Sequence, residues 1–247
     1  MFSVTLGGFG LAAAVALWWL ATALLSGKNA MVAQFTPLRA LAALPTLVAQ
    51  DQLFSHIVTS LKRVTIGLGW ALAVGVPTGY AIGRVKWLEH ALSPTLQFLR
   101  MVSPLSWMPI AVMALGVGDN AVYFLLAFAA VWPVMMSTAA GVHQIDRRWV
   151  ELGKSLAATR AEMLWHIYVP GIAPHVLTGV RLAIGILWIV LVPAEMLGVS
   201  GGLGYLILDT RDRLAYSELT ATILVIGALG FTLDIFARMA YRHYRGT

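Results

Sequence analysis

Residues 121–142 of the chain, AVYFLLAFAAVWPVMMSTAAGV, contain no charged side chain. A helix of this length rises about 33 Å at 1.5 Å per residue, and the hydrocarbon core of a bilayer is about 30 Å thick. Inside that core, backbone N–H and C=O groups must be satisfied within the protein, which a helix achieves along its own length. The stretch therefore predicts a transmembrane helix.

Five further stretches have a similar length and composition, so the expected fold is all-α, a polytopic membrane protein with six transmembrane helices. A more polar connection with Lys28 and Asp51 follows the first span, and the second span is expected to start at Val64 or as early as Ser55. The third contains Pro94, Pro104 and Pro109 and is expected to be kinked or broken. The six expected spans are residues 7–26, 64–82, 91–115, 121–142, 176–197 and 215–239.

The composition of all 247 residues supports a membrane protein and excludes two alternatives. Only 11% of the residues are charged, 59% are hydrophobic, and the mean hydropathy is +0.80. A soluble domain carries roughly 25% charged residues, and disordered chains are rich in charge and poor in apolar residues. We expect an N-terminal helix and outer connection over residues 1–52 and a core domain over residues 53–247.

The sequence lacks the residues that several kinds of functional site require. Cysteine is absent, which excludes disulfides, thiol nucleophiles and thiolate metal sites. The histidines form no ligand-like pair on one helical face, so no metal site is expected. Because the sequence has no Walker motif, catalytic triad or paired carboxylates, we expect a non-catalytic chain that binds no cofactor itself. The net charge of +6 is attributed to cytoplasmic loops and not to nucleic-acid binding.

The basic residues also predict the orientation, because short cytoplasmic loops are enriched in Lys and Arg. The balance is modest, and it is decided by the basic residues between the fourth and fifth spans, which are Arg147, Arg148, Lys154 and Arg160. Both termini and the polar loop of residues 143–174 are therefore expected in the cytoplasm. The N-terminal stretch lacks the basic start of a signal peptide and is interpreted as a retained helix.

The polar loop is expected to form two short helices, over residues 147–156 and from Thr159 to near Tyr168, before Pro170. Thr159 followed by Glu162 is the pattern of a capping box. An apolar side of the pair needs a cover, either the rest of this protein or a partner with a groove. The alternative is a linker helix on the membrane surface. The apolar side consists of Leu156, Met163, Leu164 and Ile167.

The same loop resembles the EAA loop of inner-membrane permeases of binding-protein-dependent ABC importers. In that family Glu-Ala-Ala is followed by a Gly, and later by a Leu-Pro or similar pair. Glu151 matches the acidic start, Leu152-Gly153 replaces the two alanines, and Val169-Pro170 matches the terminal pair. Ala157 stands at the usual glycine, where a left-handed turn would cost roughly 1 kcal/mol relative to Gly. Gly179 and Arg181 match a downstream Gly-x-Arg.

The resemblance extends over most of the chain. Residues 60–83 are similar to the family's first core helix, residues 103–119 to its Pro-x-x-x-Trp-x-Pro segment, and residues 188–207 to the nitrate, sulfonate and taurine branch. The resemblance implies a type I importer permease of the bacterial inner membrane, with a five-helix core plus one N-terminal helix.

The transport mechanism of the family implies partners and a substrate class. A second copy of the chain, or a similar permease, would pair with it. Two ATPase subunits carrying ATP and Mg would dock on the loops, and an extracytoplasmic binding protein would deliver a small anion such as nitrate, sulfonate or taurine. The implied coupling residues are Glu151, Gly153, Ser155, Ala157, Thr159, Arg160, Glu162, Met163, Leu164 and His166.

A few polar residues within the expected spans are candidates for the translocation pathway, because charges and broken helices at membrane depth are costly. Glu195 either faces the pathway or pairs with Arg63, Arg100 or backbone amides to hold helices together. Arg100 is either a pathway cation or a snorkelling side chain. The further candidates are Ser103, Pro104, Ser106, Trp107 and Trp188.

The main alternative is a secondary transporter or channel that acts alone, but it would need its own coupling site, usually several intramembrane acids. The glycines at 201, 202 and 204 are expected either in an outer loop that flexes or lets a binding protein approach closely, or in a plain turn. The charges from Asp209 to Arg213 are expected to form a solvated rim.

Overall fold

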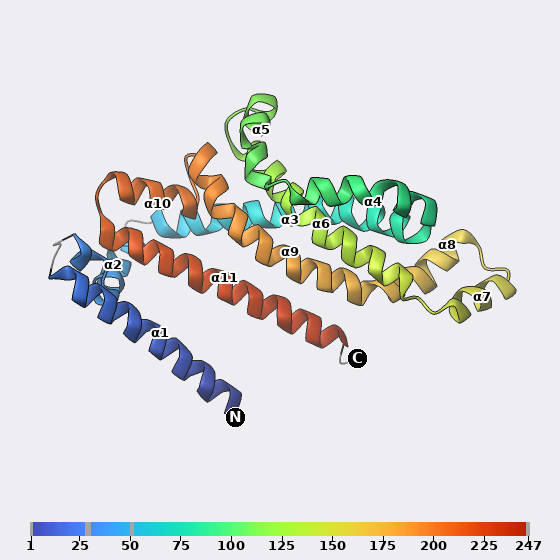
Figure 1. The fold of residues 1–247 in the computed structure, drawn as a ribbon, viewed down its shortest axis with the longest axis horizontal. Coiled ribbons are helices and arrows are strands. Elements are labelled where there is room, and N and C mark those ends of the chain that lie inside the picture. Colours follow the sequence, from blue (N-terminus) through green and yellow to red (C-terminus); the bar gives the residue numbers. More distant parts are fainter. Residues whose placement is uncertain (1, 28–30, 50–51, 246–247) are drawn as a thin grey trace. The chain divides into compact units, whose positions relative to one another are not determined.

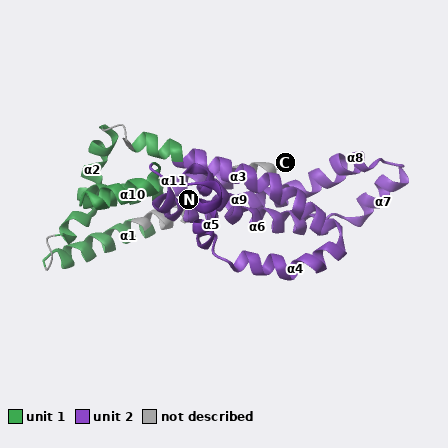
Figure 2. Ribbon diagram, turned by 90° about the horizontal axis from the view of Figure 1, so that it is seen from above, with its two compact units in different colours: residues 1–59, 201–228 green, residues 60–200, 229–247 purple. Residues whose placement is uncertain are grey.

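The computed structural model describes residues 2–27, 31–49 and 52–245, and within these ranges the regular structure is helical, without strands (Figure 1). Lys28 and Asp51 lie outside the described residues. The chain divides into two compact units, residues 1–59 with 201–228 and residues 60–200 with 229–247 (Figure 2). The predicted domain boundary after residue 52 stays a prediction.

The first unit contains a helix that the sequence did not lead us to expect. It follows α1 (Phe2–Ser26) and the 3₁₀ helix η1 (Val32–Phe35), where a polar connection was predicted, and is α2 (Pro37–Ala49). Its buried residues recur every three or four positions, as on one face of a helix, and they are Pro37, Ala40, Ala43 and Leu47. The Phe35 ring lies 5.3 Å from that of Tyr216.

The glycine-rich connection after the fifth span is also helical, as α10 (Leu203–Asp212). Gly202 precedes it with φ 108°, in the left-handed region that favours glycine, and donates its N–H to Nδ1 of His56 at 2.9 Å. Gly201 and Gly202 lie in a bend before this helix, in line with the turn interpretation, whereas Gly204 lies inside α10, where Leu203, Leu206 and Thr210 are buried. The expected charged rim is present at its end, where Arg213 pairs with Asp209 at 2.9 Å and with Glu218 at 3.2 Å.

The second unit holds the longest helices. In chain order its elements are most of α3 (Gln52–Arg84), α4 (Lys86–Met101), η2 (Pro104–Trp107), α5 (Met108–Leu115), α6 (Asp119–His143), α7 (Arg147–Ser155), α8 (Arg160–Met163), the π-helical turn η3 (Leu164–Tyr168), α9 (Val169–Gly198) and the end of α11 (Tyr216–Arg245).

Four of the described helices are long and apolar enough to cross a bilayer: α3, α6, α9 together with α8, and α11. The pair α4 and α5 adds a fifth span if it is counted as one broken helix. The first predicted span falls on α1, which is apolar over the described stretch Ala12–Ser26. The all-α class is therefore confirmed, and the total of six spans stays a prediction.

The third predicted span breaks more sharply than a kink. Between α4 and η2 the chain turns by 86°, and α4 starts at Lys86, earlier than expected. Pro94 lies inside α4 without ending it. The break falls at Ser103, whose ψ of 129° is extended, because a residue before a proline avoids the helical region.

The second loop helix was expected to end before Pro170, but it continues past this residue. After α8 the chain passes through the π turn η3 directly into α9, so that Arg160–Gly198 is one helical stretch of 39 residues. A proline inside an α-helix clashes with the carbonyl four residues earlier, and a π turn is wider. The π turn just before Pro170 therefore lets the helix continue where an ordinary α-helix would stop.

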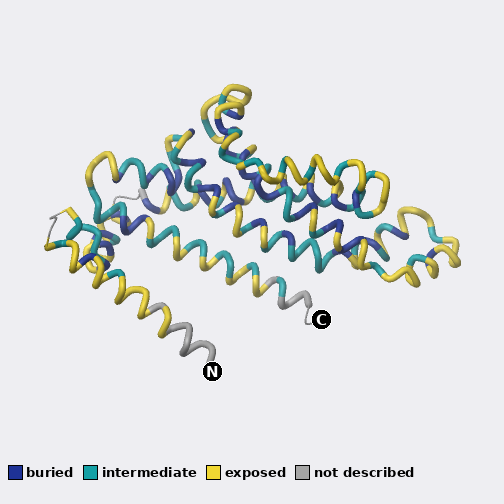
Figure 3. Tube along the Cα trace, in the orientation of Figure 1, coloured by how far each residue is buried: buried dark blue, intermediate teal, exposed yellow. Residues whose placement is uncertain are grey.

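The core of the second unit is built around α6, where buried residues concentrate (Figure 3). A Cβ added to Gly67 of α3 would lie 2.6 Å from Cβ of Leu126, and one added to Gly83 would lie 2.8 Å from Cβ of Val142. On the α9 side, a Cβ on Gly179 would lie 3.0 Å from the carbonyl oxygen of Pro133. Small residues at membrane helix contacts let backbones approach closely, and α3 and α9 approach α6 in this way.

This packing predicts opposite effects for two glycines of α3. At Gly79 a Cβ would meet the carbonyl oxygen of Met135 and lie 2.8 Å from Cβ of Thr138, whereas at Gly69 nothing lies within 4 Å. We expect Gly79→Ala to destabilise the protein by about 1–3 kcal/mol because the helices must separate. Gly69→Ala is expected to stabilise it by up to about 1 kcal/mol through helix propensity.

Thermal unfolding of the detergent-solubilised variants measures both effects. Equal midpoints for Gly79→Ala and Gly69→Ala would contradict the close approach of α3 to α6.

Candidate functional site

The loop between α6 and α9 begins with a capped helix, close to the prediction. Asp146 is the N-cap of α7, and its side chain accepts a hydrogen bond from the Arg148 N–H at 2.9 Å. Glu151, the acidic start of the motif, is exposed and accepts a hydrogen bond from Nε of Arg147 at 2.7 Å. Ser155 closes the helix by donating to the carbonyl of Leu152 at 2.8 Å.

The turn after α7 is left-handed at Ala157. The N–H of Ala157 bonds the carbonyl of Lys154 at 3.0 Å, and the N–H of Ala158 bonds the carbonyl of Gly153 at 2.9 Å. This pair of bonds is the Schellman motif, which requires the left-handed conformation that glycine adopts most easily. Ala157 adopts it with φ 53°, so the local cost considered for a left-handed turn applies.

The predicted capping box at the start of α8 is confirmed. Oγ1 of Thr159 accepts from the N–H of Glu162 at 3.3 Å, and the N–H of Thr159 donates to Oε2 of Glu162 at 2.7 Å. The ring of His166 lies 3.1 Å from the carbonyl oxygen of Glu162, and the Arg160 side chain is exposed. The cap therefore fixes where the chain turns back from α7.

Gly153 allows the two loop helices to lie against each other. A Cβ at this position would meet Sδ of Met163 and lie 2.8 Å from Cδ1 of Ile167. Met163 is buried, and Leu164 and Ile167 are half-buried, so only Leu156 of the predicted apolar side is openly exposed.

An apolar groove of about 350 Å³ is lined by residues of both loop helices. Trp149, Leu152 and Leu156 line it and are 61%, 49% and 72% exposed. Trp165, nearby in the chain, is 66% exposed. Trp149, Leu152 and Trp165 were not included in the predicted apolar side. The signal was present, since Trp149, Leu152 and Leu156 recur at the three- and four-residue spacing of one helical face. The part of the apolar side that remains uncovered is thus contributed mainly by α7.

The hairpin is tied to the helix bundle through Tyr168. This side chain is buried in a small cluster with Val142 and Ile172. Its ring meets that of Tyr80 edge-on, with centroids 5.4 Å apart, and the guanidinium carbon of Arg84 lies 5.0 Å from its centroid. A displacement of the hairpin must therefore act on the ends of α3, α6 and α9.

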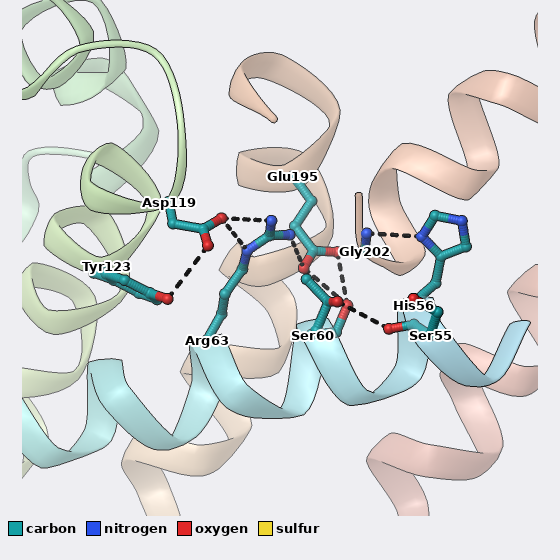
Figure 4. A network of polar contacts seen from close by, with 9 residues as sticks. Ser55, His56, Ser60, Arg63, Asp119, Tyr123, Glu195 and Gly202 are labelled. Carbon is teal, nitrogen blue, oxygen red and sulfur yellow. Dashed lines mark hydrogen bonds and ion pairs between the residues drawn. The ribbon is translucent and has the colours of Figure 1, made fainter. Parts of the chain in front are cut away.

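Glu195 lies in a buried polar network at the other end of α6 (Figure 4). Nη1 of Arg63 donates to Glu195 at 2.7 Å, and Oγ of Ser60 lies 2.8 and 2.9 Å from its two carboxylate oxygens. Nη2 of Arg63 also donates to Asp119 at 2.6 Å, and Tyr123 donates to Asp119 at 3.4 Å. The network joins α3, α6 and α9, and the contact with Arg63 is the one that the paired interpretation of Glu195 anticipated.

Ser60 and Asp119 were not singled out from the sequence. The signal for Ser60 is its place three residues before Arg63, on the same face of α3. Asp119 begins α6 directly after Gly118 and is far from Arg63 in the chain, so only the fold brings the two together.

The other pathway candidates do not converge on Glu195. Arg100 and Pro104 line a groove against α6 and α9, while Ser103 and Ser106 are exposed at the break. The ring of Trp107 lies tilted against that of Phe128, with centroids 5.6 Å apart, and Nε1 of Trp107 is buried with no hydrogen-bond partner in the described part of the chain. Trp188 packs on α11, where a Cβ on Gly230 would lie 2.5 Å from its Nε1.

Among the described residues, no group of three or more His, Cys, Asp or Glu side chains is arranged to hold a metal ion.

The fold matches that of solved transporter subunits. The chain in the inward-facing structure of the MetNI methionine ABC transporter has a TM-score of 0.66 at 13% identity, and the match covers 79% of this chain and 97% of that chain. At this identity the match shows the fold alone. The long apolar helices, the broken span and the exposed helical hairpin thus define a helical membrane protein with the fold of a transporter subunit.

The sequence comparisons give the family. Residues 65–246 match the model of the binding-protein-dependent transport system inner membrane component, and the chain belongs to this family. The bicarbonate transport system permease protein CmpB of Synechocystis sp. is 38% identical over 184 residues, 74% of this chain and 65% of that relative. The taurine transport system permease protein TauC of Escherichia coli is 34% identical over 190 residues, 77% of this chain and 69% of that relative.

The left-handed turn predicts that Ala157→Gly stabilises the hairpin. Removing Cβ relieves roughly 1 kcal/mol, which corresponds to a fivefold slower hydrogen exchange of the turn amides if they exchange through local opening. Ala161→Gly in α8, where the chain is helical, is the matched control and is expected to speed exchange. Faster exchange in Ala157→Gly would contradict the strain at this turn.

The polar network predicts unequal effects for its two acids. Glu195 is fully buried, whereas the Asp119 side chain is 45% exposed. Glu195→Ala leaves a buried arginine poorly compensated and is expected to cost about 3 kcal/mol, whereas Asp119→Ala is expected to cost about 1 kcal/mol or less.

Chemical unfolding in detergent micelles compares the two variants. A loss in Glu195→Ala no larger than in Asp119→Ala would show that the buried pair does not hold the helices together.

Proposed function

We propose that this chain is the transmembrane permease subunit of an ABC importer, forming the translocation pathway for a small anion. The exposed apolar groove on the α7–α8 hairpin carries the proposal, together with membership of a transport-system family. Exposed apolar side chains that gather in a groove mark interaction sites. A groove on a loop beyond the apolar helices fits a soluble partner better than the bilayer.

The partner proposed for this groove is an ATPase subunit, one on each of two permease copies. The hairpin and both termini would lie in the cytoplasm, where ATP is available, in agreement with the basic residues of the loop. This chain would bind neither ATP nor Mg itself, and would have no catalytic residues. An extracytoplasmic binding protein would deliver the substrate to the opposite face.

The proposed substrate class is an anion such as nitrate, a sulfonate or taurine. The names of the relatives support it, because bicarbonate is an anion and taurine carries a sulfonate group. In such a machine, ATP binding would bring the two ATPases together, and the hairpins would transfer this movement to the helix bundle.

A transporter that works alone is less well supported by the site. It would need a free intramembrane acid as its coupling group. Glu195 is engaged by Arg63 and Ser60, so the acid nearest to that role is already neutralised.

The hairpin groove predicts which side chains hold the ATPase. Leu152→Ala combined with Leu156→Ala is expected to weaken co-purification with a co-expressed partner ATPase by about ten- to a hundredfold, because interface anchors contribute about 1–3 kcal/mol. Lys154→Ala is the matched control, since Lys154 is exposed on α7 but does not line the groove.

Folding of each variant is checked by its elution as a single species in detergent. An unchanged ATPase yield with the double variant would overturn the docking surface. If no ATPase co-purifies with the unmodified chain, the proposed function itself fails.

A further inference from the structure

Two neighbouring grooves of the second unit meet at Arg100, in the last turn of α4. The α4–α6 groove has a volume of about 330 Å³ and is lined by Ser93, Gln97 and Arg100 facing Trp132. The α6–α9 groove has a volume of about 390 Å³ and is lined by Arg100 and Trp132 together with Ser137. Because Arg100 and Trp132 line both grooves, Arg100 lies where the two join.

The position of Trp132 along α6 gives the depth of this junction. At 1.5 Å per residue, Trp132 lies about 20 Å from the start of α6 at Asp119 and about 16 Å from its end at His143. Arg100, which lines the same grooves as Trp132, therefore lies beside the middle of α6, a helix long enough to cross the bilayer. Snorkelling brings an arginine to water when it lies near the end of a span, which is not where Arg100 lies.

Arg100, near the break after α4, and Arg63, in the buried polar network, differ in how their charge is compensated. Arg63 is buried and pairs with Glu195 and Asp119. Arg100 is exposed to the grooves, and the structure records no ion pair or hydrogen bond for its guanidinium group within the described ranges. A charged side chain at membrane depth that no protein group compensates indicates a functional site.

The chemistry of the junction fits an anion. A guanidinium group offers paired N–H donors that match the oxygens of a planar or tetrahedral oxyanion. Ser93, Gln97 and Ser137 add neutral donors along the two grooves. The one acid that lines either groove in the described part of the chain is Glu89, about 16 Å from Arg100 along α4, where it pairs with His143 at 3.3 Å.

We propose that Arg100 forms an anion-binding subsite midway along the translocation pathway, which holds a carboxylate, nitrate or sulfonate group as it passes. This inference rests on the proposed function and names the group that selects its substrate class. The alternative is a purely structural role, because a basic residue in the last turn of a helix interacts favourably with the helix dipole. Lysine would serve that role equally well but cannot form the paired hydrogen bonds of a guanidinium group.

The test uses the complete complex, with its ATPase subunits and binding protein, reconstituted in lipid vesicles. Uptake of nitrate, taurine and bicarbonate is measured for the unmodified chain, Arg100→Gln, Arg100→Lys and Arg39→Gln. Arg39, an exposed arginine of α2 that lines neither groove, controls for the loss of one charge. For the anion that the unmodified complex imports, we expect at least a tenfold loss with Arg100→Gln, an intermediate loss with Arg100→Lys and no loss with Arg39→Gln.

A second readout does not depend on transport. An arginine-selective dicarbonyl reagent is applied to the complex, and labelling of Arg100 and Arg39 is followed by mass spectrometry with and without each anion. We expect the imported anion to slow labelling of Arg100 at least threefold and to leave Arg39 unchanged.

The outcomes separate this subsite from the proposed function. Uptake with Arg100→Gln within twofold of the unmodified complex, equal uptake with Arg100→Lys and the unmodified complex, or labelling of Arg100 that no anion slows would overturn the subsite. Failure of Arg100→Gln to assemble while Arg100→Lys assembles and transports fully would assign the arginine a structural role. If the unmodified complex shows no ATP hydrolysis that the binding protein stimulates, this result would count against the proposed function instead.

Discussion

The close approach of α3 and α9 to α6 is the constraint on which the second unit depends. The contact is close because a side chain is missing at four glycines, and at each of them an added Cβ would collide with or crowd an atom of α6. These are Gly67, Gly79 and Gly83 of α3 and Gly179 of α9. Only at this separation can Arg63 on α3 reach both Asp119 on α6 and Glu195 on α9. Packing of small residues and pairing of charges thus stabilise each other, since a wider bundle would leave a buried charge without its partners.

Local chemistry shapes the hairpin at the other end of the bundle. Asp146 and Thr159 cap the two loop helices, the left-handed Ala157 turns the chain between them, and Gly153 lets them touch. These local choices leave the apolar side of α7 uncovered while Met163 and Tyr168 pack inward. A surface for a partner arises here because the hairpin is too small to bury all its apolar side chains.

The sequence was most informative where one local rule decides the structure. Apolar length located α6, and the spacing of Thr159 and Glu162 identified the capping box. It was less informative where distant parts decide. The helix α2 was hidden in a polar connection because its buried face depends on packing within its unit, and Asp119 joined Arg63 only through the fold. Pro94 and Pro170 were both weighed as helix breakers, yet Pro94 was accommodated within α4 and Pro170 followed a π turn.

The continuous helix from Arg160 to Gly198 has a mechanical consequence. Its 39 residues extend about 58 Å, from the hairpin past Glu195 to Gly198. A tilt of about 5° around its midpoint would displace each end by roughly 2.5 Å, in opposite directions, which is close to the length of a hydrogen bond. A small tilt at the loop end of this helix thus corresponds, at its other end, to a displacement large enough to make or break one polar contact.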